Sequence, residues 1–101
     1  MSISIAKLDE REWVISLGER FDFGSVSEFR RCYESVPVGI CKLVTIDFSG
    51  TRYMDSSALG MLINSKKHIN SDSCKIRLTN CNDQIRKIFS ISRFDKKFDI
   101  E

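Results

Sequence analysis

One short segment limits the folds open to this chain more than any other. Residues 42–48 read KLVTIDF and are rich in apolar and β-branched residues, which is typical of a central strand buried on both faces of a sheet. Apolar residues recur at helical spacing before it, over residues 25–36, and after it, over residues 57–69. A buried strand between two amphipathic helices predicts an α/β fold with parallel strands.

The other segments extend this pattern on both sides. Residues 1–8 and 13–17 alternate as strands do, and the charged link between them suits an antiparallel hairpin. A strand is expected over residues 75–79, a helix over 83–92 and a last short strand over 98–100. The predicted order is β β α β α β α with a final β. Right-handed crossovers would connect the parallel strands.

Length and charge exclude several classes of function. The 101 residues correspond to one domain. A formal net charge of +2 does not suit nucleic acid, which needs a concentrated basic patch. The run Lys66-Lys67-His68 is interpreted as a solvated helix face. No apolar run approaches the roughly 20 residues that span a bilayer. Because residues 1–9 also lack a secretory signal, a cytoplasmic location is expected.

The cysteines do not indicate a metal site. Cys32, Cys41, Cys74 and Cys81 include no CxxC pair, and His68 is the only histidine, so a zinc site is not expected. In a reducing cytosol these residues are expected to be small, partly buried thiols. No cofactor or metal is expected.

Polar residues follow the buried strand, in the segment 51–60, which reads TRYMDSSALG. The carboxyl end of a parallel strand is where open α/β sheets place their functional sites. Asp55, Ser56 or Ser57 could cap the helix that begins there. A phosphate on a serine at this point would meet the free N–H groups of the helix. From the residues alone, ordinary capping is favoured over a modification site.

Two motifs resemble those of the STAS family, which includes the anti-sigma factor antagonists. Residues 54–60, MDSSALG, resemble the family's signature loop, with Ala58 where glycine is commoner. Residues 18–23, GERFDF, resemble its turn after the second strand. The resemblance implies a single STAS domain over residues 1–101. Its fold would be α/β, a small mixed, mostly parallel sheet with an antiparallel N-terminal hairpin and helices packed against it.

The resemblance also implies the site. The phosphoacceptor of the family follows the motif aspartate, Asp55, and is therefore Ser56 here. The acidic residue of the upstream turn corresponds to Asp22. At most one of Phe21 and Phe23, which flank Asp22, is expected to point into the core. The expected partner-binding residues are Asp22, Phe23, Asp55, Ser57 and Met61.

The mechanism implied by the resemblance is partner switching, in which the chain is a binding module and not an enzyme. The unphosphorylated protein binds a serine kinase that is also an anti-sigma factor, and the ATP and Mg²⁺ belong to that kinase. Phosphorylation at Ser56 releases the protein, and a PP2C-type phosphatase restores it. Two alternatives stay open. The chain could be a STAS subunit of a lipid-transporting ABC system, or a regulator of a signalling target other than a sigma factor.

Overall fold

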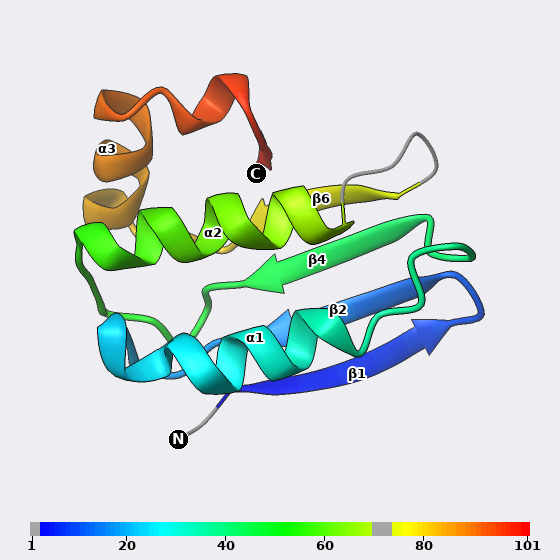
Figure 1. Ribbon diagram of the computed structural model, residues 1–101. Coiled ribbons are helices and arrows are strands. Elements are labelled where there is room, and N and C mark those ends of the chain that lie inside the picture. Colours follow the sequence, from blue (N-terminus) through cyan, green and yellow to red (C-terminus); the bar gives the residue numbers. More distant parts are fainter. Residues whose placement is uncertain (1–2, 70–73) are drawn as a thin grey trace.

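A five-stranded sheet with the strand order β1-β2-β4-β6-β7 forms the centre of the molecule (Figure 1). The computed structural model describes residues 3–69 and 74–101. The strands are β1 (Ser4–Asp9), β2 (Glu12–Ser16), β4 (Leu43–Asp47), β6 (Lys75–Thr79) and β7 (Asp99–Ile100). The β1–β2 pair is antiparallel, and the pairs β2–β4, β4–β6 and β6–β7 are parallel. The predicted mixed, mostly parallel sheet with an N-terminal hairpin is confirmed.

Three helices follow the predicted pattern closely. They are α1 (Val26–Glu34), α2 (Ser56–Ile69) and α3 (Asp83–Ile91). Figure 1 shows α1 and α2 lying next to each other over one face of the sheet, with α3 near the start of α2. A short 3-10 helix, η1 (Phe23–Ser25), leads into α1, and a second, η2 (Phe94–Lys96), precedes β7. The predicted first strand begins only at Ser4, and residues 1–2 lie outside the described part of the chain.

The central strand β4 is as buried as its composition predicts. Val44, Thr45 and Ile46 are 0, 9 and 0% exposed, so that both faces of the strand are covered. The neighbouring strands alternate instead, with Trp13 and Ile15 buried on β2 and flanked by half-buried residues. A run of apolar and β-branched residues thus marks the middle of the sheet, and an alternating run marks the strand beside it.

Aromatic rings connect the carboxyl end of β4 to two helices. The ring of Phe48, just after β4, lies edge-on to Phe21 at 6.1 Å and to Phe89 of α3 at 5.7 Å. Phe21 in turn meets Phe29 of α1 at 5.0 Å. All four side chains are at most 1% exposed. This chain of rings fixes α1 and α3 relative to the segment that follows β4.

Two strands were not predicted. β3 (Arg20–Phe21) and β5 (Tyr53–Met54) pair in parallel and form a separate two-stranded sheet. Each has two residues, too few for a period of two to be recognised in the sequence. They lie in the two segments where the motifs had been recognised, so the missed element belongs to the site.

The expectation that all four cysteines are free thiols is wrong for two of them. Cys41 and Cys74 form a disulfide, whereas Cys32 and Cys81 are free and half-buried. Cys41 lies just before β4 and Cys74 just before β6, and these strands are parallel neighbours. Their Cα atoms are therefore 5.1 Å apart, within the range that a disulfide spans. Spacing along the chain could not show this, because the two residues are 33 positions apart.

The aromatic chain predicts a large effect of truncating Phe48. Phe48→Ala should lower the free energy of unfolding by about 3–5 kcal/mol, because it opens a cavity between Phe21 and Phe89. Urea denaturation followed by circular dichroism measures this. Ile91→Ala, at a side chain that is 74% exposed, serves as the control and should change stability little. A loss below about 1 kcal/mol for Phe48→Ala would contradict the central role of the ring.

Candidate functional site

The polar segment after β4 lies at the carboxyl ends of three parallel strands. The N–H of Leu17, after β2, donates to the carbonyl of Asp47 at 3.1 Å, and the N–H of Phe48 donates to the carbonyl of Thr79 at 2.9 Å. The Asp47 carboxylate accepts from the Asn80 amide at 2.9 Å. Three connecting segments are thus joined directly beyond the sheet, and they support the small sheet formed by β3 and β5.

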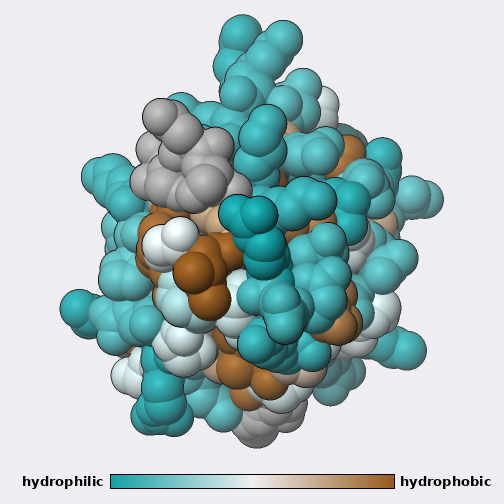
Figure 2. All heavy atoms as spheres, turned by 90° about the vertical axis from the view of Figure 1, so that its right-hand side faces the viewer, coloured by the Kyte–Doolittle hydropathy of each residue, from teal (hydrophilic) through white to brown (hydrophobic). Residues whose placement is uncertain are grey.

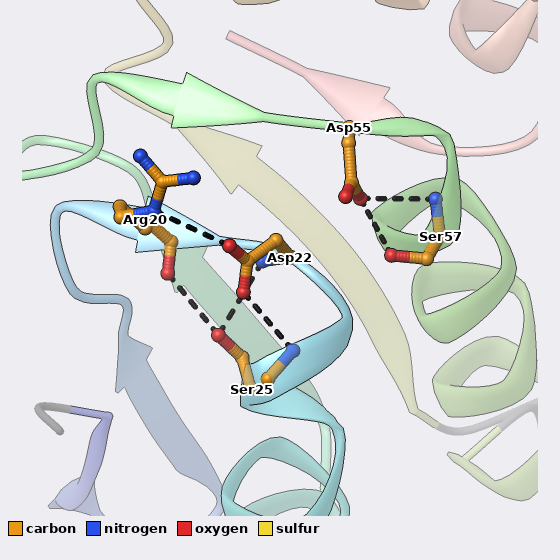
Figure 3. Close-up of polar contacts among 6 residues, drawn as sticks. Arg20, Asp22, Ser25, Asp55 and Ser57 are labelled. Atoms are coloured by element: carbon orange, nitrogen blue, oxygen red, sulfur yellow. Dashed lines mark hydrogen bonds and ion pairs between the residues drawn. The ribbon is translucent and has the colours of Figure 1, made fainter.

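The small sheet places Asp22 and Asp55 at the same end. Phe21 lies opposite Met54 in the parallel register, and each aspartate is the next residue of its strand segment. Figure 3 shows the two carboxylates at the ends of these strands, Asp22 before η1 and Asp55 before α2. The two motifs that the sequence analysis recognised separately therefore meet in space.

Asp22 organises the turn into α1. Its Oδ1 accepts from the N–H of Gly24 at 3.0 Å, and its Oδ2 lies 3.3 Å from Nε of Arg20 (Figure 3). The N–H of Asp22 donates to Oγ of Ser25, whose hydroxyl donates to the carbonyl of Arg20. This reciprocal capping box belongs to η1. The Asp22 side chain caps the 3-10 helix, and Ser25, the residue before α1, makes no side-chain cap to that helix.

Asp55 organises the start of α2. Its Oδ1 accepts from both the N–H of Ser57, at 3.0 Å, and the hydroxyl of Ser57. The hydrogen bond from the Ser57 hydroxyl is the main cause that lowers the pKa of Asp55 below its ordinary value of 3.8. Asp55 is therefore ionised near neutral pH, and Ser57 is held against it (Figure 3).

Ser56 differs from its neighbour. It is the first residue of α2 and its side chain is exposed. Within residues 3–69 and 74–101 its hydroxyl has no hydrogen-bond partner. It stands at the positive end of the helix dipole, next to the N–H groups of Ser57 and Ala58, which donate to the carboxylate and the carbonyl of Asp55. The hydroxyl is thus free to react or to be covered by another protein.

The two phenylalanines of the turn differ in exposure because β3 ends at Phe21, whereas Phe23 begins the 3-10 helix η1. Phe21 is fully buried, and Phe23 is 73% exposed. Next to Phe23, the guanidinium of Arg20 stacks on the ring of Tyr53 at 4.3 Å. Tyr53 itself is 43% exposed. Exposed aromatic and arginine side chains therefore surround the end of the small sheet, a composition that is enriched in protein interfaces.

Met61 lies beside this surface and not on its exposed part. Its side chain is 6% exposed. It lines a groove of about 320 Å³ between α1 and α2, together with Val26, Phe29, Arg30, Tyr33 and Asn64. A partner that touches Met61 would have to place a side chain in this groove.

Several residues of the site were missed by sequence reasoning. Arg20 and Tyr53 are opposite each other only because β3 pairs with β5. Asp47, the last residue of β4, was assigned no role. Burial by itself would raise the pKa of its carboxyl, but hydrogen bonds from Asn80 and Ser49 outweigh this and lower it. The left-handed backbone of Asn80, with φ of 61°, accompanies this contact; an asparagine directly after a strand was the available signal.

The one histidine of the chain, His68, lies far from Ser56 on the same helix. His68, near the far end of α2, lies against the ring of Tyr33 at 5.4 Å. Ser56 and His68 are separated by about 18 Å of helix. Among residues 3–69 and 74–101, no group of three His, Cys, Asp or Glu side chains could hold a metal ion. No helix in the same residues is long and apolar enough to cross a bilayer.

Comparison with known proteins settles the family. The sequence pattern of the STAS domain matches residues 5–101. The chain belongs to the STAS domain family. A STAS-domain containing protein of Pseudomonas aeruginosa is 38% identical over 97 residues, which cover 96% of this chain and 95% of that protein. The resemblance drawn from the motifs is thereby confirmed.

Solved STAS structures share the fold. The anti-sigma factor antagonist SpoIIAA in its unphosphorylated form matches with a TM-score of 0.75 and 18% identity, over 99% of this chain and 87% of its own. An anti-sigma factor antagonist from Mycobacterium paratuberculosis matches with a TM-score of 0.80 and 17% identity, over 98% and 85%. At these identities the likeness concerns the arrangement of helices and strands.

The contact between Ser57 and Asp55 predicts a measurable pKa change. Ser57→Ala removes the hydrogen bond from the hydroxyl, so the pKa of Asp55 should rise toward 3.8. Because the folded-state pKa is depressed, the contact stabilises the fold above the unfolded pKa, and this stabilisation is lost as pH falls through the folded pKa. Carboxyl carbon shifts of Asp55 in an NMR pH titration measure it. Ser56→Ala is the matched control and should leave the titration of Asp55 nearly unchanged; equal shifts in both variants would contradict the assignment.

Proposed function

We propose that this STAS protein is an anti-sigma factor antagonist that acts by partner switching, with Ser56 as the switch. In its unphosphorylated form it binds a serine kinase that is also an anti-sigma factor, or a similar regulator. Phosphorylation of Ser56 releases that partner, and a PP2C-type phosphatase restores binding. ATP and Mg²⁺ belong to the kinase, so this chain acts as substrate and binding module and not as an enzyme. A cytoplasmic location is part of the same proposal.

The observation that carries the proposal is the difference between two adjacent serines. The Ser57 hydroxyl is engaged by Asp55. The Ser56 hydroxyl is exposed and without a hydrogen bond to any residue that the structure describes. A kinase needs an accessible hydroxyl, and only the second of these arrangements supplies one without breaking a contact of the fold.

Charge explains how a phosphate at Ser56 would act. Phosphorylation adds a charge of roughly −1.5 to −2 and three acceptor oxygens. The helix N-terminus can accommodate this charge within the protein. A partner that covers the same surface, however, would have to desolvate the phosphate beside Asp22 and Asp55. The modified form should therefore stay folded and lose its partner.

The proposed partner surface comprises Asp22, Phe23, Asp55 and Ser57 around Ser56, with the buried Met61 reached through the groove beside it. Three of the six exposed large hydrophobic side chains of the described residues, Phe23, Val26 and Tyr53, lie on or beside it. The opposite end of the molecule, at the β1–β2 turn, is largely hydrophilic with small separate apolar patches (Figure 2). The concentration of aromatic surface near Ser56 supports docking at that end.

The first test is the position of the phosphate. Protein isolated from its native cells, with phosphatases inhibited, should carry phosphate on Ser56, as found by peptide mass mapping. Ser56→Ala should abolish the modification, whereas Ser57→Ala should retain it because the Ser56 hydroxyl is independent of Asp55. Phosphate placed only on Ser57 or Ser25 would contradict the proposal.

The second test concerns Phe23. An exposed aromatic anchor that is buried on binding typically contributes about 2 kcal/mol or more, so Phe23→Ala should weaken partner affinity about 30-fold. The circular dichroism spectrum should be unchanged because the side chain is exposed. Leu8→Ala, at the opposite end and 60% exposed, is the matched apolar control. Lys97→Ala is a second control. Loss of binding in the controls but not in Phe23→Ala would show docking by another face.

A further inference from the structure

Thr51 lies where three segments of the chain meet behind the Ser56 site. It is 3% exposed and falls between β4 and β5. Its hydroxyl donates to the carbonyl of Gly18 at 2.8 Å, and its N–H donates to the carbonyl of Phe48 at 2.9 Å. Its own carbonyl accepts from the side-chain amide of Asn82, the N-cap of α3, at 3.4 Å. Each polar group of Thr51 therefore holds a different part of the chain.

The hydrogen bond from the Thr51 hydroxyl to the Gly18 carbonyl lies just before the backbone hydrogen bonds that join β3 and β5. The carbonyl of the next residue, Glu19, accepts from the N–H groups of Arg52 at 2.8 Å and Tyr53 at 3.1 Å. These contacts lead into the pairing of β3 with β5 that places Asp22 beside Asp55. Strands of two residues have little pairing energy of their own. Their register must therefore be held from outside the pair.

We infer that Thr51 is a positioning residue for the Ser56 site. Its hydroxyl fixes the segment of Gly18 against that of Arg52, sets the register of β3 on β5 and so determines how Ser56 is presented at the start of α2. Valine would preserve the shape of the side chain but leave the partly buried carbonyl of Gly18 without its donor. Serine would keep the donor. Only the last step, the presentation of Ser56 to a kinase, rests on the proposed function.

Amide hydrogen exchange, followed by NMR on the whole chain, tests the positioning without any kinase. In Thr51→Val, the amides of Arg52 and Tyr53 should exchange about tenfold faster relative to the amides of Leu62 and Ile63 in the middle of α2. Thr51→Ser should restore the wild-type ratio. Thr45→Val makes the same chemical change at another buried threonine, outside this cluster, and should leave the ratio unchanged. An unchanged ratio in Thr51→Val, or the same change in Thr45→Val, would overturn the inference.

A second readout links the positioning to the site. In protein isolated from native cells, the share of phosphate found on Ser56 should fall in Thr51→Val and recover in Thr51→Ser. If Thr51→Val does not fold, Thr51→Ala against Thr51→Ser gives the same comparison of hydroxyl absent and present. Altered amide exchange with no phosphate on Ser56 in any variant would support the positioning and overturn the proposed function. Equal phosphorylation in all variants, with phosphate on Ser56, would overturn the last step of the inference.

Discussion

The burial of β4 on both faces is the constraint on which the rest of the structure depends. A strand covered on both sides is typical of a parallel sheet, and β4 pairs in parallel with β2 and β6. Parallel pairing requires a crossover after each strand. Those crossovers bring α1 and α2 over the sheet and collect the strand ends of β2, β4 and β6 at one edge. The same burial places Phe48 between Phe21 and Phe89. The core therefore determines both where the polar segments gather and how firmly they are held.

The two adjacent serines at this edge of the sheet have different surroundings. The Asp55 carboxylate holds Ser57 and orders the first turn of α2. Ser56 is left outside this arrangement, exposed at a helix N-terminus. Such a position can accept a phosphate without disturbing the core, because the modified residue makes none of the contacts that maintain the turn. In the proposed mechanism the fold stays constant and the partner surface changes its charge.

The sequence predicted the architecture because the signals for it are long. The run of residues 42–48, the helical spacing on either side and the charged hairpin link each extend over several residues. The small sheet of β3 and β5, and with it the stacking of Arg20 on Tyr53, depends on tertiary pairing between segments more than thirty residues apart. The Cys41–Cys74 disulfide depends on the adjacency of β4 and β6. Such contacts leave no periodic pattern in the sequence. The motif around Ser56 was recognised because it resembles a family, and not because its spacing alone distinguished a switch from a cap.

The central claim is that a charge on Ser56 controls partner binding. A quantitative pull-down from native cells, with wild-type, Ser56→Ala, Ser56→Asp and authentic phosphoserine baits, tests it most directly. Wild type and Ser56→Ala should retain the same regulator equally. Ser56→Asp should retain less, and the phosphoserine form least, because phosphate carries more charge than aspartate. Equal retention of that regulator by all four baits would contradict the account and leave Ser56 as an ordinary first residue of a helix.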